Sequence, residues 1–91
     1  MLFRSLGRHD EAISSYTHTL KLNPDFYPAW YNQGIALAQQ GRSVEAIESY
    51  DRALSYQPDD AYIWHSRGQA LAQLERHLEA LTCYEIGRAH V

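Results

Sequence analysis

The chain has little of several features that define other protein classes. A single cysteine among 91 residues excludes an internal disulfide framework. No apolar run approaches the roughly 20 residues that a membrane-spanning helix needs. Eight basic residues against eleven acidic ones, a net charge of −3, offer no basic surface for nucleic acid. We therefore predict one small domain in the cytoplasm, with no nucleic acid partner and no membrane span.

Residue patterns that carry chemistry are also missing. The five histidines never fall three or four residues apart on one predicted helix with a carboxylate or cysteine, as a metal site requires. Cys83 has no positioned base to activate it as a nucleophile. Asp59 and Asp60 are adjacent carboxylates, but they stand at a predicted helix start, where such residues cap free amides. The sequence predicts no metal, no cofactor and no catalytic site.

What the chain does contain is a repeat with an interval of 34 residues, at which Trp30 returns as Trp64 and Gly34 returns as Gly68. Further matches at the same interval are Pro24 and Pro58, Ala12, Ala46 and Ala80, Tyr16, Tyr50 and Tyr84, and the run 36–39, which returns as 70–73. Self-similarity at a period of about 20 to 50 residues is typical of a solenoid of stacked units.

Each unit contains two segments whose apolar residues recur with helical spacing. The predicted helices are 9–22, 27–40, 43–56, 61–74 and 77–85, with a helical stub at 1–6. Gly41 is predicted to end the first helix of its unit, and Asp25 and Asp59 to cap the helices that follow the two prolines. The small residues Gly34 and Gly68 are predicted to lie where paired helices approach most closely, with tyrosines filling the adjoining space.

These landmarks resemble the tetratricopeptide repeat. Its signature places Trp, Gly and an apolar residue on a first helix, Ala, an aromatic residue and Ala on a second, and then Pro; here these are Trp30, Gly34, Leu37, Ala46, Tyr50, Ala53 and Pro58. The resemblance implies an all-α fold, a right-handed α-solenoid of antiparallel helix hairpins. It divides the chain into a truncated first unit at 1–26, a complete unit at 27–60 and a second unit, incomplete at its end, at 61–85.

The last six residues depart from the repeat. Gly87 and Arg88 stand where the repeat calls for Ala and Leu, and Ile86 holds a polar position. The run also resembles the translation of a common sequencing adapter. We predict that 86–91 are a non-native, adapter-derived tail and that the native sequence ends at about Glu85. The alternative is a genuine, degenerate final repeat, and an independent read of the locus distinguishes the two.

The resemblance also implies a concave groove, lined by the first helix of each unit, that selects a peptide. Carried onto this sequence, the groove residues are Tyr31, Asn32, Ile35, Gln39, Tyr62, His65, Ser66, Gln69 and Gln73. Such a surface is aromatic and rich in amides, which suits an extended peptide backbone. Ordinary solvated surface is the alternative for these positions.

One branch of the family clamps a partner's terminal carboxylate with Lys and Arg on successive first helices, together with an Asn. Asn32 matches that Asn, but His65 and Gln69 stand where the cations belong. Since neutral histidine does not replace a permanent cation at pH 7, we predict no carboxylate capture by these two units.

Two functions remain open. The first is a protein-protein interaction scaffold, a fragment of a longer repeat protein, that binds a peptide or partner helix and has no catalysis of its own. The second is a regulatory or substrate-recruiting array of a larger enzyme of glycosyltransferase, kinase or protease type. Because repeat arrays bury each unit against the next, ends without caps also predict marginal stability and self-association.

Overall fold

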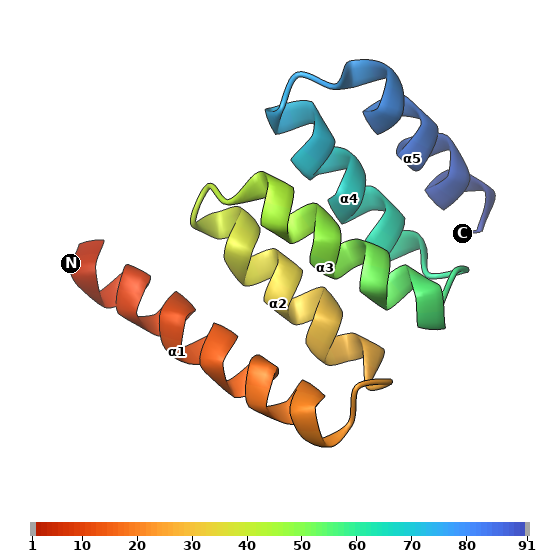
Figure 1. The fold of residues 1–91 in the computed structure, drawn as a ribbon. Helices are drawn as coiled ribbons and strands as arrows, with labels where there is room; N and C mark the ends of the chain where they lie inside the picture. The colour runs from red at the N-terminus through yellow and green to blue at the C-terminus, as the bar shows by residue number, and fades with distance from the viewer. Residues whose placement is uncertain (1, 91) are drawn as a thin grey trace.

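The computed structural model describes residues 2–90, and the side chains of residues 10–90. In that range the chain forms the helices α1 (Leu2–Leu22), α2 (Tyr27–Gln39), α3 (Ser43–Tyr56), α4 (Ala61–Gln73) and α5 (His77–Ala89). Figure 1 shows them side by side in chain order, with α1 at one edge and α5 at the other. Short turns join them, so consecutive helices are antiparallel. The predicted all-α solenoid of helix hairpins is confirmed.

Two helices differ from the prediction by more than one residue. The predicted stub, of which Met1 lies outside the described residues, and the predicted helix at 9–22 form one continuous helix, α1, because glycine inside a helix costs only about 1 kcal/mol relative to alanine and Gly7 therefore need not interrupt it. The last helix, predicted to end at 85, continues to Ala89. Gly87 is buried there, and a Cβ atom on it would lie 3.3 Å from the Ala61 carbonyl oxygen. The absence of a side chain lets α5 approach α4.

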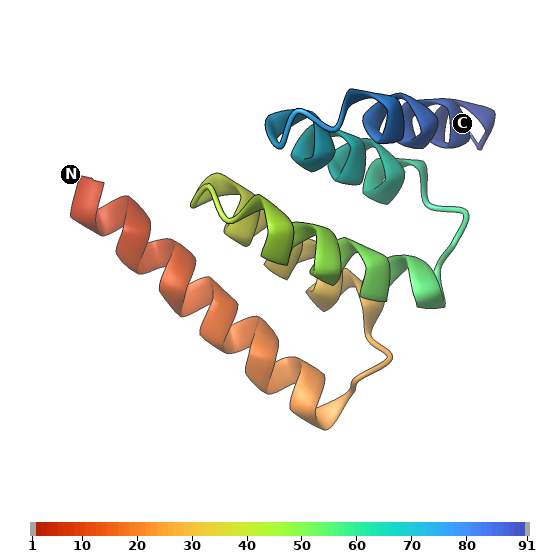
Figure 2. The same cartoon turned by 45° about the horizontal axis from the view of Figure 1, so that its top comes forward.

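The core forms where the hairpins meet. Helix α2 packs on α3 and α4 packs on α5, while α3 contacts α4 and joins one hairpin to the next. The turned view of Figure 2 separates the two pairs. The central cluster takes residues from all four of these helices: Leu37, Ala46, Ile47, Tyr50, Ala53, Leu54, Ile63, Ala70, Leu71, Ala80 and Cys83. Two pairs in this cluster, Leu37 with Leu71 and Ala46 with Ala80, are separated by the 34-residue period of the sequence.

Within each hairpin, a glycine faces a tyrosine ring. A Cβ atom on Gly34 would lie 2.5 Å from Cε1 of Tyr50, and one on Gly68 would lie 2.6 Å from Cε1 of Tyr84. Real Cβ atoms do not approach ring carbons so closely, because interiors are already packed to near-crystalline density. The prediction that tyrosines fill the space beside these glycines is confirmed.

The turn inside each hairpin uses one left-handed residue. Gly41 has a φ of +79°, and Glu75, which occupies the same position one period later, has a φ of +60°. In both turns the next amide returns to the first helix: Arg42 N–H donates to the Leu37 carbonyl and Arg76 N–H to the Leu71 carbonyl, each at 2.9 Å. This geometry satisfies carbonyls that the helix end leaves free.

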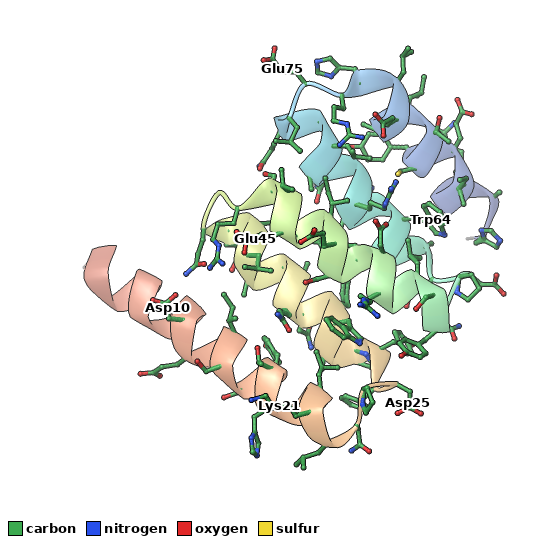
Figure 3. The ribbon with its side chains drawn as sticks, in the orientation of Figure 1. Asp10, Lys21, Asp25, Glu45, Trp64 and Glu75 are labelled. Atoms are coloured by element: carbon green, nitrogen blue, oxygen red, sulfur yellow. The ribbon has the colours of Figure 1, made fainter. Side chains whose placement is uncertain are left out.

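The turns between hairpins are held by indole and carboxylate groups. The Trp30 indole N–H donates to the Pro24 carbonyl at 2.9 Å, and the indole of Trp64, labelled in Figure 3, donates to the Pro58 carbonyl at 2.8 Å. Asp60, rather than the predicted Asp59, caps α4, since its Oδ1 accepts from the Tyr62 amide at 3.0 Å.

The prediction that Asp25 caps α2 is wrong. The capping position of α2 is held by Phe26, whose side chain makes no capping hydrogen bond. Asp25 lies one residue earlier, in the turn after α1 (Figure 3). A carboxylate has to stand immediately before the first helical residue to reach the free amides of the first turn.

Candidate binding groove

A groove of about 660 Å³ opens between α2 and α4. Its sides come from the first helices of two successive units, and a tyrosine from each second helix contributes to its lining. The lining residues are Ile35, Ala38 and Gln39 of α2, Tyr50 of α3, Ser66, Gln69, Ala70, Ala72 and Gln73 of α4, and Tyr84 of α5. Of the nine predicted site residues, five therefore lie together here: Ile35, Gln39, Ser66, Gln69 and Gln73.

Three carboxamides supply most of the groove's hydrogen-bonding capacity. Gln39 and Gln69 are exposed. Gln73 is oriented by a neighbour, since the Ser43 hydroxyl at the start of α3 donates to its Oε1 at 2.9 Å. That bond occupies the carbonyl end of the amide and leaves its NH₂ group available to donate. The groove thus offers both donors and acceptors without a formal charge.

Aromatic hydroxyls contribute to the same surface. The Tyr31 hydroxyl and the Ser66 Oγ are 3.2 Å apart and form a hydrogen bond between α2 and α4. The Tyr31 ring lies 6.0 Å from that of Tyr50, at an interplanar angle of 44°. Burial raises the pKa of Tyr50 to about 12, because the charged phenolate would lose its hydration there. The phenol is therefore neutral at physiological pH.

The other predicted site residues lie outside the groove lining. Tyr62 and His65 line a second hollow, of about 880 Å³, between α4 and α5. The His65 ring packs against Tyr84 with 5.4 Å between ring centroids. Tyr31 serves the groove indirectly, through its bond to Ser66. Asn32 is exposed on α2 and is not among the residues that line the groove.

Reasoning from sequence missed half of the lining: Ala38, Tyr50, Ala70, Ala72 and Tyr84. The pairs Ala38 with Ala72 and Tyr50 with Tyr84 do recur at the interval of 34, so the period could have flagged them. It could not show that these side chains face the groove, because that depends on how the hairpins stack.

A third hollow, of about 570 Å³, lies over α2 and α3 on residues that do not line the groove. It is lined by Trp30, Gln33, Leu37, Glu45, Glu48, Ser49, Asp51 and Arg52. Its charges are partly paired within the chain: Arg42 donates to Glu45 and lowers the pKa of that carboxyl, and Arg67 donates to Asp51 at 2.6 Å. This hollow provides control positions for experiments on the groove.

The described part of the chain lacks two features of other functional classes, a metal site and a membrane-spanning helix. No group of three or more His, Cys, Asp or Glu side chains among those residues could hold a metal ion. Cys83 is a free, buried thiol, and the Arg67 guanidinium lies 3.0 Å from its Sγ. None of the described helices is long and apolar enough to cross a membrane.

Comparisons with known proteins agree with this architecture. The family model "Tetratricopeptide repeat" matches residues 1–55, and the model "TPR repeat" matches residues 36–75. Two similar solved structures are MamA AMB-1, with a TM-score of 0.87 and 26% identity over 92% of this chain, and MamA MSR-1, with 0.87 and 25% over 91%. The chain spans about half the length of these MamA chains, 49% and 48%. None of the curated proteins matches it.

Proposed function

Because the chain belongs to the tetratricopeptide repeat family, we propose that it acts as a non-catalytic interaction scaffold that binds a peptide or a partner helix in the groove between α2 and α4. Stacked repeats present extended concave surfaces that suit such binding. Family membership supports a protein-interaction role in general. The particular binding mode has to be argued from the site, since one fold hosts many functions.

The groove itself is the observation that carries this proposal. It has a volume of about 660 Å³, which lies in the range of about 300 to 1,000 Å³ that binding pockets occupy. Its polar groups come from both units, with Gln39 on α2 and Gln69 and Gln73 on α4. A ligand that contacts all three amides therefore bridges two successive repeats.

Selection from a random peptide library displayed on phage tests the proposal. The 91-residue chain is the target, and enriched peptides are then measured against Gln69→Trp, which fills the groove from an exposed position. We expect enriched peptides to lose at least about tenfold in affinity for that variant, since a blocked groove removes the central contacts.

The matched control is Glu48→Trp, which places the same bulky side chain in the hollow over α2 and α3. Peptides that depend on the groove bind this variant as they bind the wild type. Failure to enrich any peptide, or an equal loss with both tryptophan variants, contradicts the proposal.

A further inference from the structure

We infer that the groove selects an extended peptide segment without charged side chains and holds it chiefly through the peptide's main chain. This inference rests on the proposed function and narrows it, because it chooses an extended segment over a helix and an internal stretch over a charged terminus. Three properties of the groove support it: its charge, the spacing of its amides and the fixed orientation of one of them.

The first property is the absence of charge. None of the ten described residues that line the groove is acidic or basic. A charged ligand side chain that entered would lose hydration without gaining a counter-charge, and burial of an unpaired charge is strongly unfavourable. The same argument applies to a free carboxylate at a peptide terminus. The groove therefore disfavours the acidic and basic segments that charged grooves select.

The second property is the spacing of the amides on α4. Gln69 and Gln73 are four residues apart, which places them about 6 Å apart along the helix axis. Main-chain groups that point the same way in an extended strand repeat every two residues, about 6.6 to 6.8 Å. The two amides can therefore reach alternate residues of one extended chain. A bound helix would leave them unused, since its interior main-chain groups are already paired.

The side chains beside these amides in the groove lining are small. Ala38, Ala70 and Ala72 line the groove with side chains of one carbon. Small side chains let a second main chain approach closely enough for hydrogen bonds of about 2.9 Å. Ile35 adds an aliphatic contact for a neutral side chain of the ligand.

The third property is the orientation of Gln73. The hydrogen bond from Ser43 to its Oε1 directs its NH₂ group away from α3 and makes it available to a ligand carbonyl. Ser43 is 5% exposed and does not line the groove, so a ligand does not contact it. Ser43 is thus a positioning residue, and its loss allows the Gln73 amide to rotate.

The first test is the composition of the selected peptides. Among peptides that bind the wild type and Glu48→Trp but not Gln69→Trp, we expect uncharged central segments and equal affinity with free or capped termini. Groove-dependent peptides with charged cores, with helical periodicity or with an essential terminal carboxylate overturn this inference while leaving the proposed function intact. If no groove-dependent peptide emerges, it is the proposed function that fails, so the two failures are distinguishable.

The second test uses the strongest such peptide in titration calorimetry. We expect Gln69→Met and Gln73→Met, which keep volume but lose the amide, each to weaken binding about three- to tenfold. Gln57→Met is the matched control and should leave affinity unchanged, because Gln57 lies outside the groove lining. Raising the salt from about 0.05 to 0.5 M should change the dissociation constant by less than about twofold. A strong salt dependence, or unchanged affinity in both groove variants, overturns the inference.

The role of Ser43 is tested by a double-mutant cycle. Ser43→Ala should weaken peptide binding by about as much as Gln73→Met, and the combined variant should be no weaker than Gln73→Met alone. If the role of Ser43 is purely structural, the fold-losses in peptide affinity of Ser43→Ala and Gln73→Met should instead multiply in the combined variant. Thermal melts of the free variants show whether folding has changed.

Discussion

At the scale of single residues, the turn inside each hairpin depends on one backbone angle. Gly41 and Glu75 both adopt a positive φ, although they differ in side chain. For a residue with a Cβ atom, the left-handed region costs roughly 1 to 2 kcal/mol, whereas glycine enters it freely. The unit at 61–85 therefore carries strain that the unit at 27–60 lacks.

Replacing Glu75 with glycine should relieve this strain. We expect Glu75→Gly to raise the free energy of unfolding by about 1 kcal/mol, measured by urea denaturation. The matched variant Gly41→Ala should lower it by a similar amount. Apart from Gly41 itself and its chain neighbours, no heavy atom lies within 4 Å of a Cβ built on Gly41, so that loss would come from the backbone alone. Equal stability of wild type and Glu75→Gly contradicts the prediction.

The glycine beside Tyr50 leads to a second prediction. Gly34→Ala should lower the free energy of unfolding by about 1 to 2 kcal/mol, because the clash with the buried Tyr50 ring outweighs the gain in helix propensity. In a Tyr50→Leu background, the same change should cost less, which chemical denaturation of the four cycle members measures. A stabilising effect of Gly34→Ala in the wild-type background contradicts the packing argument.

At the scale of helices, α2 and α4 occupy equivalent places but start differently. Asp60 accepts hydrogen bonds from the amides of Tyr62 and Ile63, whereas Phe26 leaves the first turn of α2 without a side-chain cap. Phe26 is also half exposed, at 50%, so little packing depends on it. The start of α2 therefore lacks the side-chain cap that α4 has.

We expect Phe26→Asp to raise the free energy of unfolding by less than about 1 kcal/mol, because Pro28 has no N–H and the carboxylate can accept only from the Ala29 amide, which already donates to the carbonyl of residue 26 at 3.1 Å. The matched variant Asp60→Ala should lower it by about 1 kcal/mol, since Asp60 accepts from two amides. Thermal melting monitored by circular dichroism gives both values. A loss of stability in Phe26→Asp would show that the Phe26 ring contributes more than a cap.

At the scale of the whole molecule, stacking of the hairpins covers the apolar face of α3 and leaves the equivalent face of α5 exposed. Ile47 on α3 is 8% exposed where α3 contacts the next hairpin, but Leu81, one period later on α5, is 51% exposed. Leu78 on α5 is 83% exposed and Tyr62 on α4 is 78% exposed. Exposed apolar residues gathered in this way often mark association sites.

We therefore expect the chain to self-associate through its α5 face as its concentration rises. Sedimentation equilibrium should show a dimer or larger species, and Leu81→Glu should shift the population to monomer. Val44→Glu is the matched control, because Val44 is also exposed, at 60%, but lies on α3 within the array. A wild-type chain that is monomeric at all accessible concentrations contradicts the prediction of self-association.

The proposed origin of residues 86–91 is a separate question at this scale. In the structure, Gly87 packs against α4 and α5 continues to Ala89, so 86–89 are helical as the repeat requires, while Val91 lies outside the described residues. Packing of this kind does not bear on their genetic origin. The adapter hypothesis stays a prediction, which an independent read of the locus tests.

The sequence alone was enough to predict α2, α3 and α4 to within one residue at each end, at 27–40, 43–56 and 61–74 against the observed Tyr27–Gln39, Ser43–Tyr56 and Ala61–Gln73. These boundaries follow from local causes: helical spacing of apolar residues, glycine at a turn and proline between units. The pairing of Gly34 with Tyr50 was equally accessible, because it recurs at a fixed interval.

Only the tertiary structure decided which of those helical residues share a groove. It placed Tyr62 and His65 in a separate hollow, left Asn32 outside the lining, and added Tyr50 and Tyr84 from the second helices. Periodicity identifies the face of a helix, but the angle at which one hairpin stacks on the next determines which faces meet. That angle is set by packing between side chains far apart in sequence, which no local pattern contains.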